Sequence, residues 1–387
     1  MRKYYADSYT TQFETQIAER LTLADSRRAV VLNESYFYPT SGGQPHDTGT
    51  LNGVRLVDVQ VREQDGAVLH VLESEVEGDA VSAQIDWPRR FDLMQQHTGQ
   101  HILSAALFEV AEALTVGFHL GAESSTIDLA TDSLSADEIA RAERLANEIV
   151  WENRPITAQF IHKADIPNYP LRKIPDVPGD ALRLVIIPNF DYNACGGTHV
   201  RGTAEVGMVK VNRVERVRGQ VRVEFRCGAR ALADYDRKER LISQLANDLT
   251  CAMEDLPHNV ANMQRDIKQA NKRLKKQGSQ LLQMEAQQLA VPNGTTIHVF
   301  KQRDANELRQ LANGVVRAGN GVALLAAAGS PATLAFARAK SADGDMNALL
   351  QAVLAQTDGT GGGSATFAAG GGFKATVAEL EGMLRGL

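Results

Sequence analysis

The sequence predicts an α+β fold made of several domains. Short apolar runs between Gly, Asp and Asn clusters fill residues 1–88, as is typical of strands, and helical spacing of apolar residues begins at Arg89. The length of 387 residues corresponds to about two to three domains. Because 43% of the residues are hydrophobic and 23% are charged, the chain can bury a sizeable core, which excludes wholesale disorder.

Charge and cysteine content narrow the class of protein. The formal net charge of −6 argues against a protein that coats nucleic acid with its whole surface. The uncharged stretch 318–337 is interrupted by glycines, and the N-terminus is polar, so we expect neither a membrane span nor a signal peptide. Three cysteines cannot form a complete disulfide framework, which favours a reducing, cytoplasmic setting.

Residues 1–88 are expected to form a small β-barrel or a curled sheet. The loop 37–45, FYPTSGGQP, is too rich in Gly and Pro to be regular. Its paired glycines are explained by ordinary turn chemistry or by close approach of the backbone to a ligand. The apolar runs that predict strands are 29–32, 54–61, 67–72 and 80–85.

Residues 89–228 are expected to form a mixed α/β domain. Helical spacing covers 89–110, and Ser135 with Glu138 forms an N-cap signature that opens a helix through Trp151. The expected strand segments are 116–129, 182–187 and 206–225.

Residues 229–290 are expected to form a helical connector, broken at Pro257 into an antiparallel hairpin. The second arm carries apolar residues at alternating spacings of three and four, which is typical of a coiled-coil face. An ordinary amphipathic hairpin packed on its own domain would give the same pattern. Residues 291–387 switch to short strands and alanine-rich helices and end in a glycine-rich segment.

Two short motifs carry the chemistry. In HTGQH (97–101), two histidines at i and i+4 share one helix face, at a separation that holds one metal ion. In CGGTH (195–199), two glycines let a thiolate and an imidazole point to the same centre. The residues His97, His101, Cys195 and His199 supply one sulfur and three nitrogens, a tetrahedral set suited to Zn²⁺. Four protein ligands are typical of a closed structural site, whereas a catalytic zinc keeps a position for water or substrate.

Two basic runs stand out against the acidic average. Residues 201–230 contain eight basic and three acidic side chains, and residues 265–276 contain six basic side chains and one acidic one. A charge run is commonly a solvated face. Two such runs in a chain of net charge −6 favour a partner with a phosphate backbone.

HTGQH paired with CGGTH resembles the editing-domain signature of alanyl-tRNA synthetases and of the free-standing AlaX editing proteins. The segment FYPTSGGQ (37–44) resembles the family's glycine-rich loop, and GTGGGSATFAAGGG (359–372) resembles the end of a DHHA1 domain. The resemblance spans nearly the whole chain. It implies a barrel over 1–88, a zinc-containing editing domain of the synthetase second-additional-domain type over 89–228, a connector over 229–290 and a DHHA1-like domain over 291–387.

The resemblance also implies an activity and its residues. We expect a zinc-dependent hydrolase that deacylates tRNA(Ala) mischarged with serine, or with glycine, and that edits in trans without aminoacylation. By this resemblance Gln44 lies in the loop that faces the zinc ion, and Thr40 is the loop hydroxyl that senses the serine side chain. No general base is assigned; His46 is a candidate, although a role as a turn residue is the favoured interpretation. The C-terminal domain is expected to grip the tRNA body or to form a homodimer.

Two other functions remain open on the sequence. A tRNA-binding module with a purely structural zinc would need the same four ligands. A metallohydrolase acting on small esters or amides would also use them, but it would leave the two basic runs unexplained.

Overall fold

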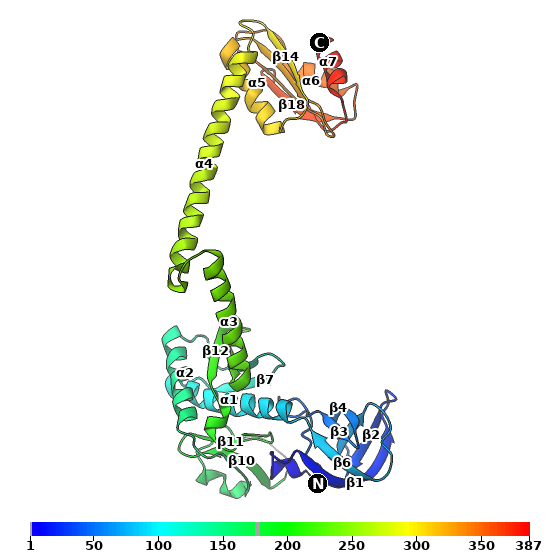
Figure 1. Ribbon diagram of the computed structural model, residues 1–387, viewed down its shortest axis with the longest axis vertical. Coiled ribbons are helices and arrows are strands. Elements are labelled where there is room, and N and C mark those ends of the chain that lie inside the picture. The colour runs from blue at the N-terminus through cyan, green and yellow to red at the C-terminus, as the bar shows by residue number, and fades with distance from the viewer. Residues whose placement is uncertain (1, 175–178) are drawn as a thin grey trace. The chain divides into compact units, whose positions relative to one another are not determined.

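The computed structural model describes residues 2–174 and 179–387 (Figure 1). The chain forms two compact units, Met1–Leu245 and Ala246–Leu387. Helices and strands mix in both, which confirms the α+β class, while the division into four domains stays a prediction. No helix in the described ranges has the length and the apolar character that crossing a bilayer requires.

A closed barrel of antiparallel strands begins the first unit, as predicted. Neighbouring strands follow the order β1-β2-β5-β4-β3-β6, and β6 pairs back with β1. Alternate residues of β6 are buried, because successive side chains of a strand point to opposite faces of the sheet. Aliphatic side chains and Phe37 fill the interior. The strands are β1 (Gln12–Thr22), β2 (Arg28–Leu32), β3 (Gly49–Leu51), β4 (Val54–Val61), β5 (Val68–Leu72) and β6 (Ala80–Ile85).

Helix α1 (Trp87–Ala111) follows the barrel, and its N-terminal end lies beside the barrel in Figure 1. Pro88 lies in its first turn, where no backbone N–H is needed. Every residue from Leu93 to Leu107 is buried. The polar side chains of this stretch must therefore find partners inside the protein, and the histidines of the first motif are among them.

Two small sheets and helix α2 (Ala136–Trp151) pack around α1. The strand orders are β12-β13-β8-β7 and β11-β10-β9. The Ser135–Glu138 capping box opens α2 as predicted. Aliphatic residues of α1, α2 and the four-stranded sheet form one core. The strands are β7 (Thr115–Leu120), β8 (Ser125–Leu129), β9 (Thr157–His162), β10 (Ala181–Ile187), β11 (Asp191–Ala194), β12 (Val209–Val217) and β13 (Gln220–Cys227).

The helical region breaks earlier than the sequence predicts. Helix α3 (Gly228–Asp248) ends before a turn in which Thr250 is left-handed, and α4 (Leu256–Leu289) begins at Leu256. The predicted break at Pro257 is therefore wrong: Pro257 lies in the first turn of α4, where proline is well tolerated. Because α3 lies mainly in the first unit and α4 in the second, the hairpin stays a prediction.

The second unit is built on a five-stranded sheet of order β14-β15-β16-β18-β17. The C-terminal part of α4 packs on α5 through Leu282, Ala286 and Leu289. Short strands and helices occur as predicted, but the alanine-rich segments form strands β15 and β16 rather than helices. The DHHA1 assignment stays a prediction. The elements are β14 (Thr295–Phe300), α5 (Ala305–Gly319), β15 (Val322–Ala327), β16 (Thr333–Arg338), α6 (Met346–Leu354), β17 (Thr360–Gly363), β18 (Phe367–Gly371) and α7 (Val377–Arg385).

Candidate metal centre

The first half of the site lies on α1. His97 and His101 are one helical turn apart and buried, and their ring centroids are 5.3 Å apart. Gly99 lies between them, and a Cβ at this position would overlap Sγ of Cys227 on β13. Only glycine therefore lets α1 approach the sheet this closely, and that packing fixes both imidazoles.

The second half is the loop 195–199, which follows β11. The buried guanidinium of Arg183 fixes its course, because Nη1 donates to the carbonyl oxygens of Cys195 (2.8 Å) and Gly197 (3.0 Å). Gly197 lies so close to α1 that a Cβ there would overlap the ring of His97. The loop thereby directs Cys195 and His199 toward the helix.

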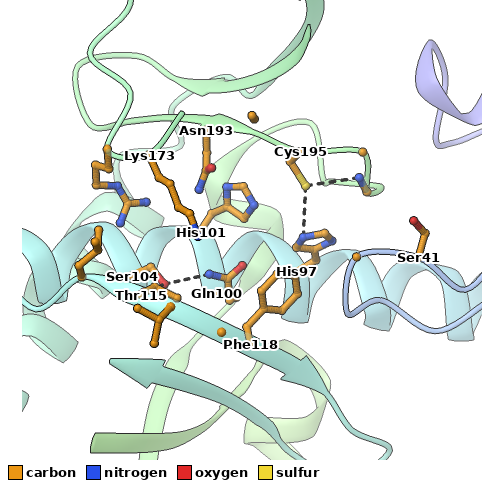
Figure 2. A pocket seen from close by; sticks show the side chains of 18 of the residues that line it. Ser41, His97, Gln100, His101, Ser104, Thr115, Phe118, Lys173, Asn193 and Cys195 are labelled. Carbon is orange, nitrogen blue, oxygen red and sulfur yellow. Dashed lines mark hydrogen bonds between the residues drawn. The ribbon is translucent and has the colours of Figure 1, made fainter. Parts of the chain in front are cut away.

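The structure brings the four predicted ligands together. Their candidate ligand atoms all lie within 4.8 Å of one another. Sγ of Cys195 is 3.4 Å from Nε2 of His97 (Figure 2) and 3.3 Å from Nε2 of His199. Two ligands of one tetrahedral zinc are about 3.5 Å apart, given Zn–S and Zn–N distances of about 2.3 and 2.0–2.1 Å. The donor set therefore fits zinc.

A second layer of side chains holds each imidazole by Nδ1. Nδ1 of His97 lies 2.8 Å from Oε1 of Gln44, and that of His199 lies 3.1 Å from Oγ1 of Thr98. Nδ1 of His101 lies 3.1 Å from Oδ2 of Asp191. These partners fix the ring orientations and leave each Nε2 for the common centre, an arrangement typical of metal-binding histidines.

Cys195 and His199 have the charge states that a metal cation requires. Burial by itself raises the pKa of the Cys195 thiol, but electrostatic interaction with the neighbouring imidazoles, that of His97 first, outweighs it and holds this pKa well below its ordinary value. Burial also lowers the pKa of His199 to about 3, which keeps that ring neutral. A thiolate and a neutral imidazole are the forms that bind a metal. For His101 burial lowers the pKa, but the hydrogen bonds to Asp191 and Cys195 outweigh it and raise the pKa to about 9, so this ring must release a proton when a metal binds.

The cluster forms one wall of a cavity of about 330 Å³. Figure 2 shows His97, His101 and Cys195 in this wall, with Phe118 beside His97. The glycine-rich loop contributes Ser41, the segment after β9 contributes the cationic Arg172 and Lys173, and neutral polar side chains come from α1, β7 and β11. These are Gln100, Ser104, Thr115 and Asn193. Among the described residues that line the cavity there is no aspartate or glutamate.

The two residues expected from the glycine-rich loop lie in different places. Gln44 is fully buried, where its Oε1 faces His97 and its Nε2 donates to Oγ1 of Thr198 at 2.7 Å. Thr40 is exposed, and its hydroxyl lies 3.0 Å from Nδ1 of His46. Thr40 and His46 are not among the residues that line the cavity, whereas Ser41 is.

Apart from Gln44, sequence reasoning missed the residues that support the ligands. Thr98 stands inside the HTGQH motif and Asp191 four residues before Cys195, so proximity to the motifs was the available signal. Arg183 gave no signal, because its role depends on the antiparallel pairing of β10 with β11.

The first basic run is largely neutralised in the structure. Five of its members pair with carboxylates, and three of these partners, Asp92, Asp128 and Glu143, lie outside the run. The pairs are Lys210–Glu143, Arg213–Glu215, Arg222–Asp128, Arg226–Glu224 and Arg230–Asp92. The excess of positive charge counted along the sequence is therefore mostly compensated across strands and helices.

The second basic run, on α4, keeps its excess of positive charge in the structure. All six basic side chains are exposed, and none forms an ion pair with an acidic residue in the described parts of the chain. They are Arg265, Lys268, Lys272, Arg273, Lys275 and Lys276. This helix is the stronger candidate for contact with a phosphate backbone.

Two family models match parts of this chain. A family model described as "Threonyl and Alanyl tRNA synthetase second additional domain" matches residues 182–223, which include the CGGTH loop. A model described as "tRNA synthetases class II (A)" matches residues 4–89, which form the barrel and its first connection.

The relatives fall into two kinds. The alanyl-tRNA editing protein AlaX-L of Pyrococcus horikoshii is 30% identical over 95% of this chain and 94% of its own length. The alanine–tRNA ligase of Pyrococcus abyssi is 31% identical over 79% of this chain, but the match spans only 35% of the ligase. The solved C-Ala domain of Aquifex aeolicus alanyl-tRNA synthetase is 23% identical over 25% of this chain and 92% of that chain, with a TM-score of 0.22. On the nearly end-to-end match with AlaX-L, the chain belongs to the family of alanyl-tRNA editing proteins.

Proposed function

We propose that this protein is a zinc-dependent aminoacyl-tRNA hydrolase that removes serine from mischarged Ser-tRNA(Ala) in trans and does not itself charge tRNA. Gly-tRNA(Ala) is the second proposed substrate. Similarity to AlaX-L supports the editing reaction. The physical need is that a site selective for alanine cannot strongly reject glycine or serine, so a separate hydrolytic site must remove them.

The observation that carries the proposal is the place of the ligand set in a cavity wall. Three of the four proposed ligands, His97, His101 and Cys195, line the cavity. A purely structural zinc is closed off by its ligands, whereas a catalytic one must meet its substrate. When bound, zinc would supply a Lewis acid that polarises the ester carbonyl or lowers the pKa of an attacking water.

The chain's own side chains would bind and orient the aminoacyl ester. Ser104 accepts hydrogen bonds from Nε2 of Gln100 (2.9 Å) and from Oγ1 of Thr115 (2.8 Å), which fixes these groups along the cavity. Because the described lining contains no carboxylate, we assign no carboxylate as general base. Besides the cationic Arg172 and Lys173, the polar lining consists of neutral hydrogen-bonding groups, which favour a substrate with a hydroxyl over one without it.

Gln44 is proposed as a positioning residue, since it contacts His97 and Thr198. Thr40 stays the proposed sensor of the serine side chain, although Ser41 already lines the cavity. Comparing Thr40→Val with Ser41→Ala separates the two hydroxyls. The variant that loses preference for Ser-tRNA(Ala) over Ala-tRNA(Ala) identifies the sensor, and if neither changes this ratio, the loop hydroxyls do not set specificity.

The test of the function is deacylation of a panel of charged tRNA(Ala). We expect rapid release of serine, release of glycine, and a rate for alanine close to that without enzyme. Zinc-loaded protein that leaves Ser-tRNA(Ala) intact would contradict the proposal.

A tRNA-binding module with a structural zinc is the alternative, and the four protein ligands favour it. Cys195→Ala distinguishes the two. Loss of turnover with retained fold and tRNA affinity supports catalysis, whereas loss of cooperative unfolding supports a structural zinc.

We also propose that the basic run of α4 contacts the tRNA. Replacing Lys268, Lys272 and Lys275 with Glu should weaken tRNA binding and reduce its salt dependence. The matched control replaces Lys210, Arg213 and Arg222, which already pair with carboxylates, and should weaken binding less. Equal losses would contradict the assignment.

A further inference from the structure

The face of α1 that carries two of the proposed ligands also carries two polar side chains that the metal centre does not use. His97, Gln100, His101 and Ser104 stand at positions i, i+3, i+4 and i+7, which share one face of a helix, and all four line the cavity. Ser104 follows His101 by one turn (Figure 2). Because such neighbours are about 5–6 Å apart at Cβ, a small molecule held at the metal centre can also reach Ser104.

The hydrogen bonds around Ser104 determine what its hydroxyl can offer to a ligand. Nε2 of Gln100 donates to Oγ of Ser104 at 2.9 Å, and Oγ1 of Thr115 on β7 donates to the same oxygen at 2.8 Å. A hydroxyl has two acceptor lone pairs and one hydrogen, so both lone pairs of Ser104 are occupied. Only its hydrogen is left, which makes Ser104 a donor and not an acceptor toward the cavity.

The hydrogen of Ser104 meets no acceptor within the described parts of the chain. A serine in a helix commonly donates to the carbonyl oxygen four residues earlier, as Ser279 does to Lys275 at 3.0 Å, but Ser104 forms no such bond to Gln100. Ser104 is only 1% exposed and faces the cavity. A ligand that fills the cavity must therefore bring an acceptor to this hydrogen or leave a buried donor unpaired, which is unfavourable.

We propose that Ser104 is a specificity-determining residue, whose hydroxyl donates to the side-chain oxygen of a seryl ester held at the metal centre. This inference rests on the proposed hydrolysis of Ser-tRNA(Ala). The ester carbonyl is assigned to the metal centre, so the acceptor that meets Ser104 is a different atom of the substrate. The hydroxyl of a seryl group supplies such an atom, whereas a protonated α-amino group only donates hydrogen bonds and cannot serve.

A donor at this place discriminates among the three amino acids. The methyl group of alanine accepts no hydrogen bond, so an alanyl ester leaves the hydrogen of Ser104 unpaired, and a glycyl ester does the same. Rejection of this kind is stronger than rejection by size alone, because a buried polar group of the site loses its partner. Thr40 or Ser41 can contact the same substrate hydroxyl, since a hydroxyl accepts from one partner and donates to another.

The first test is binding of two stable analogues, adenosine with a seryl or an alanyl group in 3′-amide linkage, measured by calorimetry on the zinc-loaded full chain. We expect the seryl analogue to bind about 10- to 100-fold more tightly, and Ser104→Ala to remove most of this preference. Ser125→Ala is the matched control and should keep the preference, because Ser125 is equally buried, its hydroxyl has no hydrogen-bond partner, and it is not among the described residues that line the cavity.

Three outcomes would overturn the proposal. They are equal affinities of the unmodified protein for both analogues, an unchanged preference in Ser104→Ala, and an equal loss of both affinities in that variant. The last outcome would place Ser104 against the ribose, which the two analogues share. Circular dichroism checks that each variant is folded.

Thr115 is a positioning residue in this scheme, and Thr115→Val tests it. The replacement keeps the shape of the side chain but frees one lone pair of Ser104, so Ser104 is no longer restricted to donating. The preference for the seryl analogue should fall about 3- to 10-fold. An unchanged preference would contradict the donor-only state of Ser104.

Deacylation separates this inference from the proposed function. Ser104→Ala should slow release of serine from Ser-tRNA(Ala) but leave release of glycine from Gly-tRNA(Ala) nearly unchanged, since glycine has no side-chain acceptor. Hydrolysis of both tRNAs with an unchanged ratio of serine to glycine release in Ser104→Ala would contradict the inference alone. Selective binding of the seryl analogue without hydrolysis of either tRNA would contradict the proposed function and leave the role of Ser104 supported.

Discussion

One turn of α1 lies between two cysteine thiols, and the pKa values of these thiols are shifted in opposite directions. On one side Cys195 faces His97 and His101; on the other, Cys227 packs against Gly99 in the apolar core. Burial raises the pKa of both thiols. For Cys227 burial prevails, whereas the surrounding imidazoles reverse the shift for Cys195. Burial alone therefore does not predict the pKa of a cysteine thiol, because the neighbouring side chains can reverse the shift.

The largest expected contrast is between replacements of the two cysteines. Cys195→Ala removes a proposed ligand and should abolish stoichiometric zinc binding and reduce deacylation at least about 100-fold. Cys227→Ala should keep both. Zinc content by elemental analysis and rates with Ser-tRNA(Ala) measure the two effects. Equal zinc content in both variants would show that Cys195 is not a zinc ligand.

Alkylation of the zinc-free protein should separate the thiols by pH. Because the pKa of Cys195 is lowered, its thiolate persists below pH 8, and its reaction with iodoacetamide should hardly fall between pH 8 and pH 6. An ordinary thiol with a pKa of about 8.5 slows about 10-fold per pH unit there. The raised pKa and burial of Cys227 predict no reaction. Peptide mass spectrometry gives both rates, and zinc should protect Cys195.

Removing the charge of Asp191, which contacts the proposed ligand His101, should weaken zinc binding by an intermediate amount. Asp191 holds Nδ1 of His101 and also pairs with Arg172 at 2.6 Å. Asp191→Asn should weaken zinc binding about 10- to 100-fold. Asp128→Asn, at the surface pair with Arg222, is the control and should leave zinc affinity unchanged. Competition with a chromophoric chelator measures the affinities, and equal effects would argue against a supporting role for Asp191.

The smallest effect is expected on stability, at the contact between Gly99 and Cys227. Gly99→Ala places a Cβ against Sγ of Cys227 and should lower the free energy of unfolding by about 1–3 kcal/mol. Gly278→Ala on α4, where a Cβ meets nothing, should raise it by up to about 1 kcal/mol. Adding Cys227→Ala to Gly99→Ala should recover part of the loss. Denaturant unfolding tests this, and an unchanged midpoint for Gly99→Ala would mean that α1 does not depend on this close approach.

The sequence predicts the ligands better than their supports. His97 and His101 follow from helical spacing, and the paired glycines of the second motif allow Cys195 to turn back. Arg183 could not be predicted, since its contact depends on how β10 and β11 pair. Thr40 and Ser41 are neighbours in the glycine-rich loop, and only the backbone course decides which hydroxyl reaches the cavity.

The acidic partners of the basic runs also could not be predicted from the sequence. The run 201–230 and the run on α4 look alike when counted along the chain, yet only the first finds its counter-ions in Asp92, Asp128 and Glu143. Spacing along the sequence predicts which side chains are neighbours on one helix, but it does not predict which side chains form ion pairs across a sheet. The barrel and α2, by contrast, follow from local signals, namely strand alternation and the Ser135–Glu138 cap.

The central claim is that the cluster on the first side of the α1 turn is a catalytic zinc site. The most direct measurement is hydrolysis of Ser-tRNA(Ala) by the same protein preparation after zinc removal and after zinc is restored. We expect hydrolysis to stop without zinc, while folding and tRNA binding persist, and to return with one equivalent of metal. An undiminished rate in the zinc-free, folded protein would contradict it.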